Sequence, residues 1–293
     1  MQHTRILLTG VNGQVGWELR RTLAPLGQVV AMDSKALDLA DADAIRAKVR
    51  EVAPRIIVNP AAYTAVDKAE SEPGRARLVN AVAPAVLAEA ADQCGAMLVH
   101  YSTDYVFDGR KETPYLEDDV THPLNVYGAT KLDGEAAIRA SGVRHLILRT
   151  SWVYGARGGN FLLTMQRLMQ ERPELRIVDD QIGAPTWSRM IAEATALILA
   201  QCLSPARGAD RPEPWGTYHL TCGGETSWYG FAAAIAELGG YPTRLTPIPS
   251  SDYPTPARRP ANSRLDNGKL ARVFGLRLPH WREALKRCLD RAD

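Results

Sequence analysis

Tyr127 and Lys131 have the residue types and the spacing for proton transfer. They lie four positions apart, so in a helix both side chains project from one face. An ammonium beside a phenol stabilises the phenolate, and bringing the pKa of a tyrosine from about 10 towards neutrality takes roughly 3 to 4 kcal/mol. Thr103 adds a hydroxyl at the end of the apolar stretch 97–103. Because the pair alone also fits a solvated helix face, its meaning depends on the surrounding elements.

The strongest of these elements is a glycine-rich turn near the N-terminus. Gly10, Gly13 and Gly16 follow the apolar run 5–9 and precede a helical pattern of apolar residues. Glycine permits a positive φ and a close approach of the backbone to a diphosphate, and the helix N-terminus offers unpaired N–H groups. The spacing is G-x-x-G-x-x-G rather than the G-x-G-x-x-G of ordinary dehydrogenases. This turn predicts a dinucleotide site.

Asp33 ends the next predicted strand, 23 residues after Gly10. A carboxylate at this point can accept hydrogen bonds from the adenosine ribose hydroxyls and repels a 2′-phosphate, which favours NADH over NADPH. Ser34 and Lys35, which follow Asp33, can partly accommodate a 2′-phosphate. The alternative role for Asp33 is to cap a helix. The sequence therefore predicts a nicotinamide cofactor and favours NADH, without deciding between NADH and NADPH.

Composition limits the class of protein. The chain has 293 residues, of which 45% are hydrophobic and 23% charged, with a net charge of +2 and no long basic run. This is enough for a sizeable core and gives no support for nucleic-acid binding. Since we find neither an apolar stretch of membrane-spanning length nor a signal peptide, we expect no membrane association and a cytoplasmic location. Four scattered cysteines lack metal-ligand spacing and are interpreted as packing thiols: Cys94, Cys202, Cys222 and Cys288.

The first half of the chain alternates apolar strands with amphipathic helices. Predicted strands cover residues 5–9, 28–32, 55–59, 97–101 and 145–149, and predicted helices cover 41–52, 74–93 and 126–140. This order predicts an α/β fold with a Rossmann-type, doubly wound parallel sheet whose ligands bind beyond the carboxyl ends of the strands. We assign residues 1–150 to a dinucleotide-binding domain and 151–293 mainly to a smaller C-terminal α/β substrate-binding region, allowing later segments to return to the first sheet.

In the second half the pattern is looser. Helices are predicted near 160–170, 189–202, 228–238 and 280–291, and residues 203–217 are interpreted as a surface loop. Residues 242–260 hold 6 of the 19 prolines, too many for a helix. We interpret this segment as a stiff loop that either presents arginines to a phosphate or simply connects its neighbours.

Several strings together resemble the extended short-chain dehydrogenase/reductase family. The glycine pattern, Thr103 and the Tyr-x-x-x-Lys pair give the general resemblance. Residues 13–19, 65–73, 101–109, 123–128, 149–154, 180–186 and 259–265 are similar, at collinear spacing, to the branch that reduces a dTDP-linked 4-ketosugar. The resemblance implies reduction of the C4 ketone of dTDP-4-dehydro-β-L-rhamnose to dTDP-β-L-rhamnose with NADPH or NADH, the last step of dTDP-rhamnose synthesis.

The resemblance also assigns roles to residues. Tyr127 is expected to donate the proton, Lys131 to hold the nicotinamide ribose and lower the pKa of Tyr127, and Thr103 to hydrogen-bond the ketone oxygen. The expected cofactor-binding residues are Gly10, Gly13, Gln14, Val15, Gly16, Asp33, Asp38, Leu39, Ala62, Tyr63, Thr64, Tyr101, Tyr127 and Lys131. The expected substrate-binding residues are Thr103, Asp104, Trp152, Asn160, Gln181 and Arg259.

One departure from the family concerns metal. Some related reductases form dimers bridged by a divalent metal between acidic helix residues, and Glu18 stands where one ligand could be. Arg189 occupies the place of another acid, so we expect no metal, a solvated Glu18, and a monomer or weak homodimer. Asn59 and Asn80 resemble positions that tie strands together in the family, and we interpret both as structural.

Two other functions stay open at this point. A nucleotide-sugar epimerase or 4,6-dehydratase shares the glycine turn and the Tyr–Lys pair, but the dehydratases usually carry a second acid where this chain has Tyr105 after Asp104. A non-catalytic regulatory subunit, like the β subunit of methionine adenosyltransferase, also resembles this family. The intact set of Thr103, Tyr127 and Lys131 makes that role unnecessary.

Overall fold

Six parallel strands form the central sheet of the structure, a computed structural model that describes residues 4–204 and 213–290. The strand order is β10-β5-β4-β3-β1-β2, and every neighbouring pair is parallel. The strands are β1 (Arg5–Leu8), β2 (Gln28–Ala31), β3 (Ile56–Asn59), β4 (Met97–Thr103), β5 (His145–Thr150) and β10 (Gly216–His219). The predicted doubly wound parallel sheet is confirmed.

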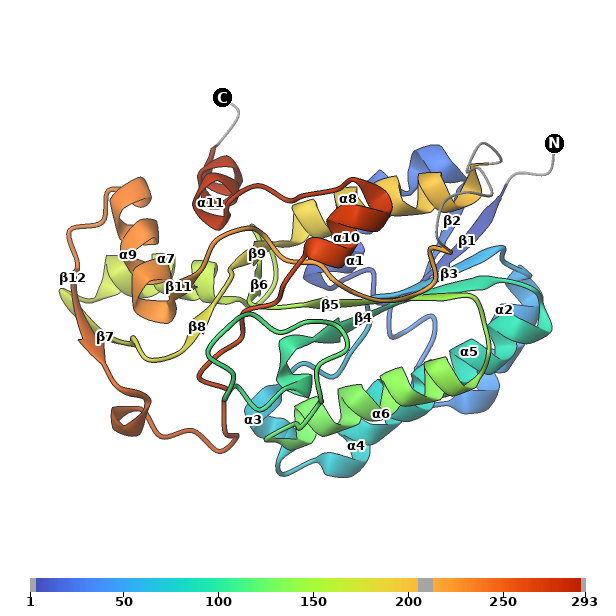
Figure 1. The fold of residues 1–293 in the computed structure, drawn as a ribbon, viewed down its shortest axis with the longest axis horizontal. Helices are drawn as coiled ribbons and strands as arrows, with labels where there is room; N and C mark the ends of the chain where they lie inside the picture. The colour runs from blue at the N-terminus through green and yellow to red at the C-terminus, as the bar shows by residue number, and fades with distance from the viewer. Residues whose placement is uncertain (1–3, 205–212, 291–293) are drawn as a thin grey trace.

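Successive residues of the buried strands face opposite layers of helices. Ile6 and Leu8 of β1 belong to the core cluster that includes residues of α1, α8 and α10, whereas Leu7 packs with residues of α2, α5 and α6. This alternation follows from the two-residue period of a strand. Figure 1 shows the two helical layers on either side of the sheet. The helices are α1 (Gln14–Thr22), α8 (Ser188–Leu203) and α10 (Gly268–Phe274) on one side, and α2 (Ala42–Val52), α5 (Ala83–Gln93) and α6 (Val126–Ala140) on the other.

The helix predicted over 74–93 consists of three consecutive segments. These are α4 (Pro73–Arg77), a π-helical stretch η2 (Leu78–Val82) and α5. The buried Asn80 lies in the π-helical stretch, where its side chain accepts from the backbone N–H of Tyr63 at 2.8 Å and donates to the carbonyl of Tyr63 at 3.1 Å. Asn80 thus ties the segment after β3 to this helix. The short helix α3 (Val66–Ala69) precedes α4.

The remaining elements gather beyond one end of the sheet (Figure 1). They are α7 (Phe161–Glu171), α9 (Trp228–Gly239), α11 (Trp281–Leu289), the parallel pair β7 (Glu174–Val178) and β12 (Arg244–Ile248), and the short strands β6 (Val153–Tyr154), β8 (Ile182–Gly183), β9 (Thr186–Trp187) and β11 (Thr226–Ser227). Single 3₁₀ turns are η1 (Ala24–Leu26), η3 (Asp104–Val106) and η4 (Ser250–Asp252). The helices and strands beyond the end of the sheet share a hydrophobic core that contains Tyr154, Phe231 and Trp281. This core is separate from the two clusters of the central sheet.

Two loop predictions need correction. Residues 244–248 form strand β12 within the segment predicted to be a loop, with Pro247 opposite Ile177 of β7. Proline is tolerated there because each strand of a two-stranded sheet has a free edge. In the segment 203–217, α8 extends to Leu203 and β10 begins at Gly216, while residues 205–212 lie outside the described part.

The division at residue 150 stays an interpretation. Residues of both halves build the central layers, since β10 pairs with β5 and α8 packs against α1. Within the described ranges, no helix is both long enough and apolar enough to span a membrane.

Candidate active site

A cavity of about 540 Å³ lies at the carboxyl ends of the parallel strands. Its walls include thirteen of the fourteen residues predicted to bind a cofactor: Gly10, Gly13, Gln14, Val15, Gly16, Asp33, Asp38, Leu39, Ala62, Thr64, Tyr101, Tyr127 and Lys131. Tyr63 does not line the cavity; its hydroxyl donates to Glu72 at 2.7 Å. The sequence pattern thus brings together residues from four strand ends and two helices.

The glycines of the turn are required by the backbone. Gly10 has a φ of +58° and lies so close to Ala61 that a Cβ would be 2.8 Å from its Cα. A Cβ on Gly16 would be 2.1 Å from the carbonyl oxygen of Gly10. Helix α1 can therefore begin directly beneath the turn, with the backbone N–H groups of its first residues near the cavity. The residues present fit a dinucleotide diphosphate.

Asp33 lies at the end of β2 on the cavity wall. Its Oδ1 accepts from the backbone N–H groups of Lys35 and Ala36 at 3.0 and 2.9 Å, and its Oδ2 accepts from Asn12 at 3.3 Å. These hydrogen bonds, with that from Ala36 the strongest influence, hold the pKa of the Asp33 carboxyl below its usual value. An ionised carboxylate thus stands where the cofactor's adenosine ribose is expected.

Lys131 is 1% exposed and lines the same cavity. Its Nζ donates to the carbonyl oxygen of Tyr101 at 2.6 Å and lies 3.1 Å from Nε2 of His100. Burial lowers the pKa of Lys131 to about 8, although the charge of Glu135 opposes the shift. Lys131 is therefore still mainly an ammonium at neutral pH.

Tyr127, Thr103 and Asp104 form a contiguous polar group. The carboxylate oxygen Oδ1 of Asp104 accepts from Oγ1 of Thr103 at 3.0 Å, and Thr103 also shares a hydrogen bond with Tyr127. Thr103 does not line the cavity itself, although its hydrogen-bond partner Tyr127 does. Burial raises the pKa of Asp104 to about 6, opposed by hydrogen bonds with Ser263 and Thr103.

The expected lowering of the Tyr127 pKa is wrong for this structure. Burial raises the pKa of Tyr127 to about 12, and the hydrogen bond with Thr103 only partly offsets it. The reason is the direction of Lys131, whose Nζ is held by His100 and Tyr101 of β4. Four-residue spacing brings the two side chains to one helix face but does not fix where a long side chain points.

Trp152 follows β5 in an unusual backbone conformation. Its φ is +48°, a value that bulky residues rarely adopt. The indole stacks on Trp228 with ring centroids 3.6 Å apart and an interplanar angle of 9°. Gly183 makes room for it, because a Cβ there would be 2.6 Å from the indole. The strained backbone and the stacked pair together build a partly exposed aromatic wall.

The three other predicted substrate residues are engaged in bonds within the chain. Asn160 caps α7 and donates to Gln14 at 3.1 Å, which ties it to the glycine turn. Gln181 donates to Ser250 at 2.9 Å and accepts from Trp228 at 3.2 Å. Arg259 forms an ion pair with Asp67 at 2.8 Å. The cavity lining includes none of the three, nor Asp104 or Trp152.

The cavity is also lined by residues that were not among the predicted site residues. Ser102 and Thr150 lie at the ends of the paired strands β4 and β5, and Thr150 Oγ1 is buried with no hydrogen-bond partner among the described residues. Arg75, near Asp38, and the glycines of residues 158–159 also line the cavity. The strand-end position was the available signal for Ser102 and Thr150, whereas no local motif marks Arg75.

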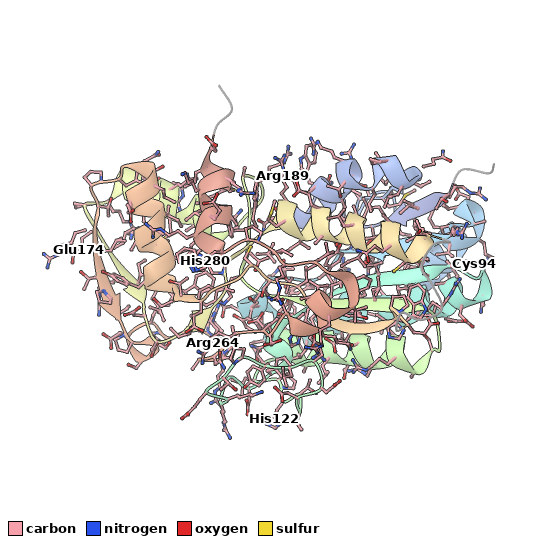
Figure 2. The ribbon with its side chains drawn as sticks, turned by 45° about the horizontal axis from the view of Figure 1, so that its top comes forward. Cys94, His122, Glu174, Arg189, Arg264 and His280 are labelled. Carbon is pink, nitrogen blue, oxygen red and sulfur yellow. The ribbon has the colours of Figure 1, made fainter. Side chains whose placement is uncertain are left out.

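The Glu18 prediction needs correction as well. Glu18 is not a solvated helix residue, because its carboxylate lies 3.4 Å from Nε of Arg189 and its side chain is 16% exposed. Figure 2 labels Arg189, at the start of α8 near the outer surface.

In the described residues no group of three or more His, Cys, Asp or Glu side chains could hold a metal. Cys94, also labelled in Figure 2, is exposed rather than packed, whereas Cys222 is buried as predicted.

A sequence profile of the family described as RmlD substrate binding domain matches residues 4–293. The chain belongs to this family. Among RmlD-family relatives, the dTDP-4-dehydrorhamnose reductase of Burkholderia thailandensis is 52% identical over 97% of this chain and 98% of its own length. The reductase of Escherichia coli K12 is 48% identical over 97% of each chain.

Solved structures of RmlD-family reductases agree with this assignment. A dTDP-4-dehydrorhamnose reductase from Bacillus anthracis, solved in complex with NADP, has a TM-score of 0.91 and 35% identity, and the match covers 98% of this chain and 99% of that one. The resemblance predicted from the sequence strings is therefore confirmed at the level of the family and its reductase branch.

Proposed function

We infer that this chain catalyses the NAD(P)H-dependent reduction of the C4 ketone of dTDP-4-dehydro-β-L-rhamnose to dTDP-β-L-rhamnose. The observation that carries this conclusion is the full-length identity of 52% to a dTDP-4-dehydrorhamnose reductase. The cavity supports it, because the glycine turn and the Tyr127–Lys131 pair both line it. A nicotinamide cofactor bound there supplies the hydride.

Tyr127 is the proposed proton donor to the sugar oxygen. Its pKa of about 12 keeps the phenol protonated at neutral pH, so it can deliver a proton as negative charge develops on the oxygen. Thr103 donates to Asp104 and shares a hydrogen bond with Tyr127. This group orients the phenol, and the Thr103 hydroxyl can turn from Asp104 to donate to the phenolate that proton transfer leaves.

Lys131 is proposed to hold the nicotinamide ribose and Asp33 the adenosine ribose. Two acceptors engage the Lys131 ammonium, so one N–H group is available to a ribose hydroxyl in the cavity. The Asp33 carboxylate is fixed by two backbone N–H groups and favours a free 2′-hydroxyl.

The proposed sugar site lies on the outer side of Tyr127, between Asp104 and the Trp152 wall. A stacked indole pair offers a flat apolar surface to a deoxysugar ring. Asn160, Gln181 and Arg259 remain proposed contacts for the nucleotide and its diphosphate. Arg259 lies near Tyr105 and keeps its cationic state beside Asp67.

Elimination chemistry has less support than reduction. Tyr105 stands where a dehydratase carries its second acid, and burial raises its pKa far above neutrality. Its ring contacts Tyr127 edge-on with centroids 5.5 Å apart. Tyr105 is thus a packing partner of Tyr127 rather than a proton carrier. The cytoplasmic location and the monomer or weak homodimer state stay predictions.

The test is an assay with dTDP-4-dehydro-β-L-rhamnose, made enzymatically, in which the absorbance of NADH or NADPH is followed after adding this protein. We expect oxidation of the cofactor together with one equivalent of dTDP-β-L-rhamnose. Cofactor binding without turnover of the ketosugar would favour the regulatory role. Release of an epimerised or dehydrated sugar without net cofactor oxidation would favour the other enzymes.

A further inference from the structure

A buried chain of polar side chains leads from the glycine turn to Lys131. Oγ1 of Thr9 lies 2.6 Å from Oδ1 of Asn59, Nδ2 of Asn59 lies 3.1 Å from Nδ1 of His100, and Nε2 of His100 lies 3.1 Å from Nζ of Lys131. These contacts cross three neighbouring strands, from the residue after β1 through the end of β3 to the middle of β4, and reach α6. Thr9, Asn59, His100 and Lys131 are each no more than 1% exposed.

The protonation state of Lys131 decides which hydrogen-bond pattern fits these positions. An ammonium has three donors and no lone pair, so His100 Nε2 must then accept and the ring proton must be on Nδ1. Asn59 accepts that proton when its amide is turned by 180° about Cβ–Cγ, which exchanges oxygen and nitrogen at nearly the same places. Nδ2 of Asn59 then donates to Thr9.

The other pattern requires a neutral lysine. If Asn59 Nδ2 donates to Nδ1, a neutral His100 carries its proton on Nε2, where it faces Nζ of Lys131. Only an amine with a free lone pair can accept that proton. A cationic His100 is excluded at neutral pH, because burial and the Lys131 charge hold the pKa of His100 well below its usual value.

The surroundings of Lys131 favour the ammonium. The Tyr101 carbonyl accepts at 2.6 Å, and Glu135 lies one turn further along α6. The Glu135 carboxylate is itself paired with Arg149 of β5 at 2.7 Å. Tyr127, one turn before Lys131, is neutral at pH 7. His100 and the Tyr101 carbonyl thus provide two acceptors for a cation, and the third donor is left for the cavity.

We propose that His100 is a positioning residue for Lys131: Asn59 holds it in the Nδ1–H tautomer, so that Nε2 accepts one N–H of the ammonium and another points to the cofactor ribose. The ribose contact rests on the proposed function. The tautomer and the Lys131 geometry do not, and both the tautomer and the affinity for the cofactor can be measured without turnover of a sugar.

The direct test is ¹⁵N NMR of the full-length, uniformly labelled protein at pH 7. Long-range ¹H–¹⁵N correlations distinguish the two tautomers, and the His100 signals are assigned by their loss in His100→Gln. We expect a protonated Nδ1 and a bare Nε2. A protonated Nε2 with a bare Nδ1, or an imidazolium, would overturn the proposal.

A matched pair of variants tests the effect on Lys131. His100→Leu removes the acceptor, while the carbonyl of His100→Gln can reach about the same place as Nε2. In the Leu variant we expect the Kd for NADH, measured by fluorescence, to rise about tenfold or more. We expect the alkaline limb of the kcat/KM profile to move down by about one pH unit, since a lost acceptor favours the neutral amine.

In the Gln variant we expect both the Kd for NADH and the alkaline limb to lie close to their wild-type values. Equal losses in the two variants, or an unmoved alkaline limb in the Leu variant, would assign His100 a purely structural role. If the Leu variant does not fold, the wild-type tautomer and the Gln variant still decide. The protein can also fail to reduce the ketosugar while His100 has a bare Nε2 and the cofactor binds normally. That result would refute the proposed function and leave the role of His100 intact.

Discussion

The Cα of Gly128 lies so close to the carbonyl oxygen of Tyr105 that a Cβ at this position would be 2.2 Å from it. This approach brings the first turn of α6 against η3, and with it Tyr127 against Thr103. Asn125 fixes the same turn by accepting from the N–H of Gly128 at 2.8 Å and donating to the carbonyl of Arg258 at 2.7 Å. The position of the proposed proton donor thus depends on the absence of one side chain.

Gly128→Ala should therefore lower both stability and turnover. The contact is with a backbone oxygen, which cannot move aside cheaply, so we expect a loss of about 1–3 kcal/mol in the free energy of unfolding. Denaturant unfolding and kcat measure the two effects. Gly74→Ala is the control, because nothing lies within 4 Å of its added Cβ in α4. A Gly128→Ala variant as stable and active as the Gly74→Ala variant would contradict the packing argument.

Tyr127→Phe should abolish proton donation while keeping the ring. We expect kcat to fall by about 10² to 10⁴, with little change in the Kd for NADH. Tyr105→Phe is a matched control, since its ring contacts Tyr127 edge-on and its hydroxyl has no assigned role in the chemistry. Comparable losses in the two variants would mean that the tyrosine cluster, rather than the Tyr127 hydroxyl, is what the reaction needs.

The sequence predicted elements and strand-end positions well, for physical reasons. Residues 126–140 have a clear helical pattern and an Asn cap, and α6 has those bounds. Strand β12 was missed because it is short and contains Pro247, so only its pairing with β7 defines it. Local pattern predicts an element when its own residues determine it, and fails when a distant partner does.

The same distinction applies to the site. The positive φ of Gly10, the contact of Gly16 with Gly10 and the turn at Asp33 are local backbone geometry that a motif encodes. In contrast, the hydrogen bond of Asn160 to Gln14 joins residues 146 positions apart, and the direction of Lys131 is set by β4. No spacing in the sequence specifies such contacts. The raised pKa of Tyr127 was not anticipated because its main cause, burial, also depends on how distant elements pack around the side chain.

Asp33→Asn should shift cofactor preference towards NADPH. The amide oxygen can still accept from Lys35 and Ala36, but the charge that repels a 2′-phosphate is gone. We expect the ratio of kcat/KM for NADPH to that for NADH to rise by about tenfold, equivalent to about 1.4 kcal/mol. Asp38→Asn is the control on the same wall and should leave the ratio unchanged. An unchanged ratio in Asp33→Asn would show that Asp33 does not select the cofactor.

Trp152→Ala should weaken sugar binding selectively. It removes the indole that stacks on Trp228 at 3.6 Å, so we expect the KM for the sugar nucleotide to rise about tenfold or more. The Kd for NADH should hold, because Trp152 does not line the cofactor cavity. Trp152→Phe retains a flat ring, so its KM for the sugar nucleotide should lie between those of the parent and the Ala variant. A normal KM in the Ala variant would make Trp152 a packing residue only.

Asp104→Asn should change how stability depends on pH. The pKa of Asp104 is raised from 3.8 to about 6 by burial. Between about pH 4 and 6 the unfolded chain releases this proton while the folded protein keeps it, so raising the pH through this window lowers the free energy of unfolding. The amide has no charge to bury, and its oxygen can still accept from Thr103. We therefore expect the variant to be more stable than the parent at pH 8, by up to about 3 kcal/mol.

Asp108→Asn provides the control of opposite sign for Asp104→Asn. A hydrogen bond from the backbone of Arg110 lowers the pKa of the Asp108 carboxyl, so its ionised form stabilises the fold above its unfolded pKa. Removing that carboxylate should lower stability at pH 8 and leave the slope between pH 4 and 6 in place. Urea unfolding at several pH values measures both variants. If Asp104→Asn is less stable than the parent at pH 8 and keeps the slope, burial of Asp104 does not oppose its ionisation.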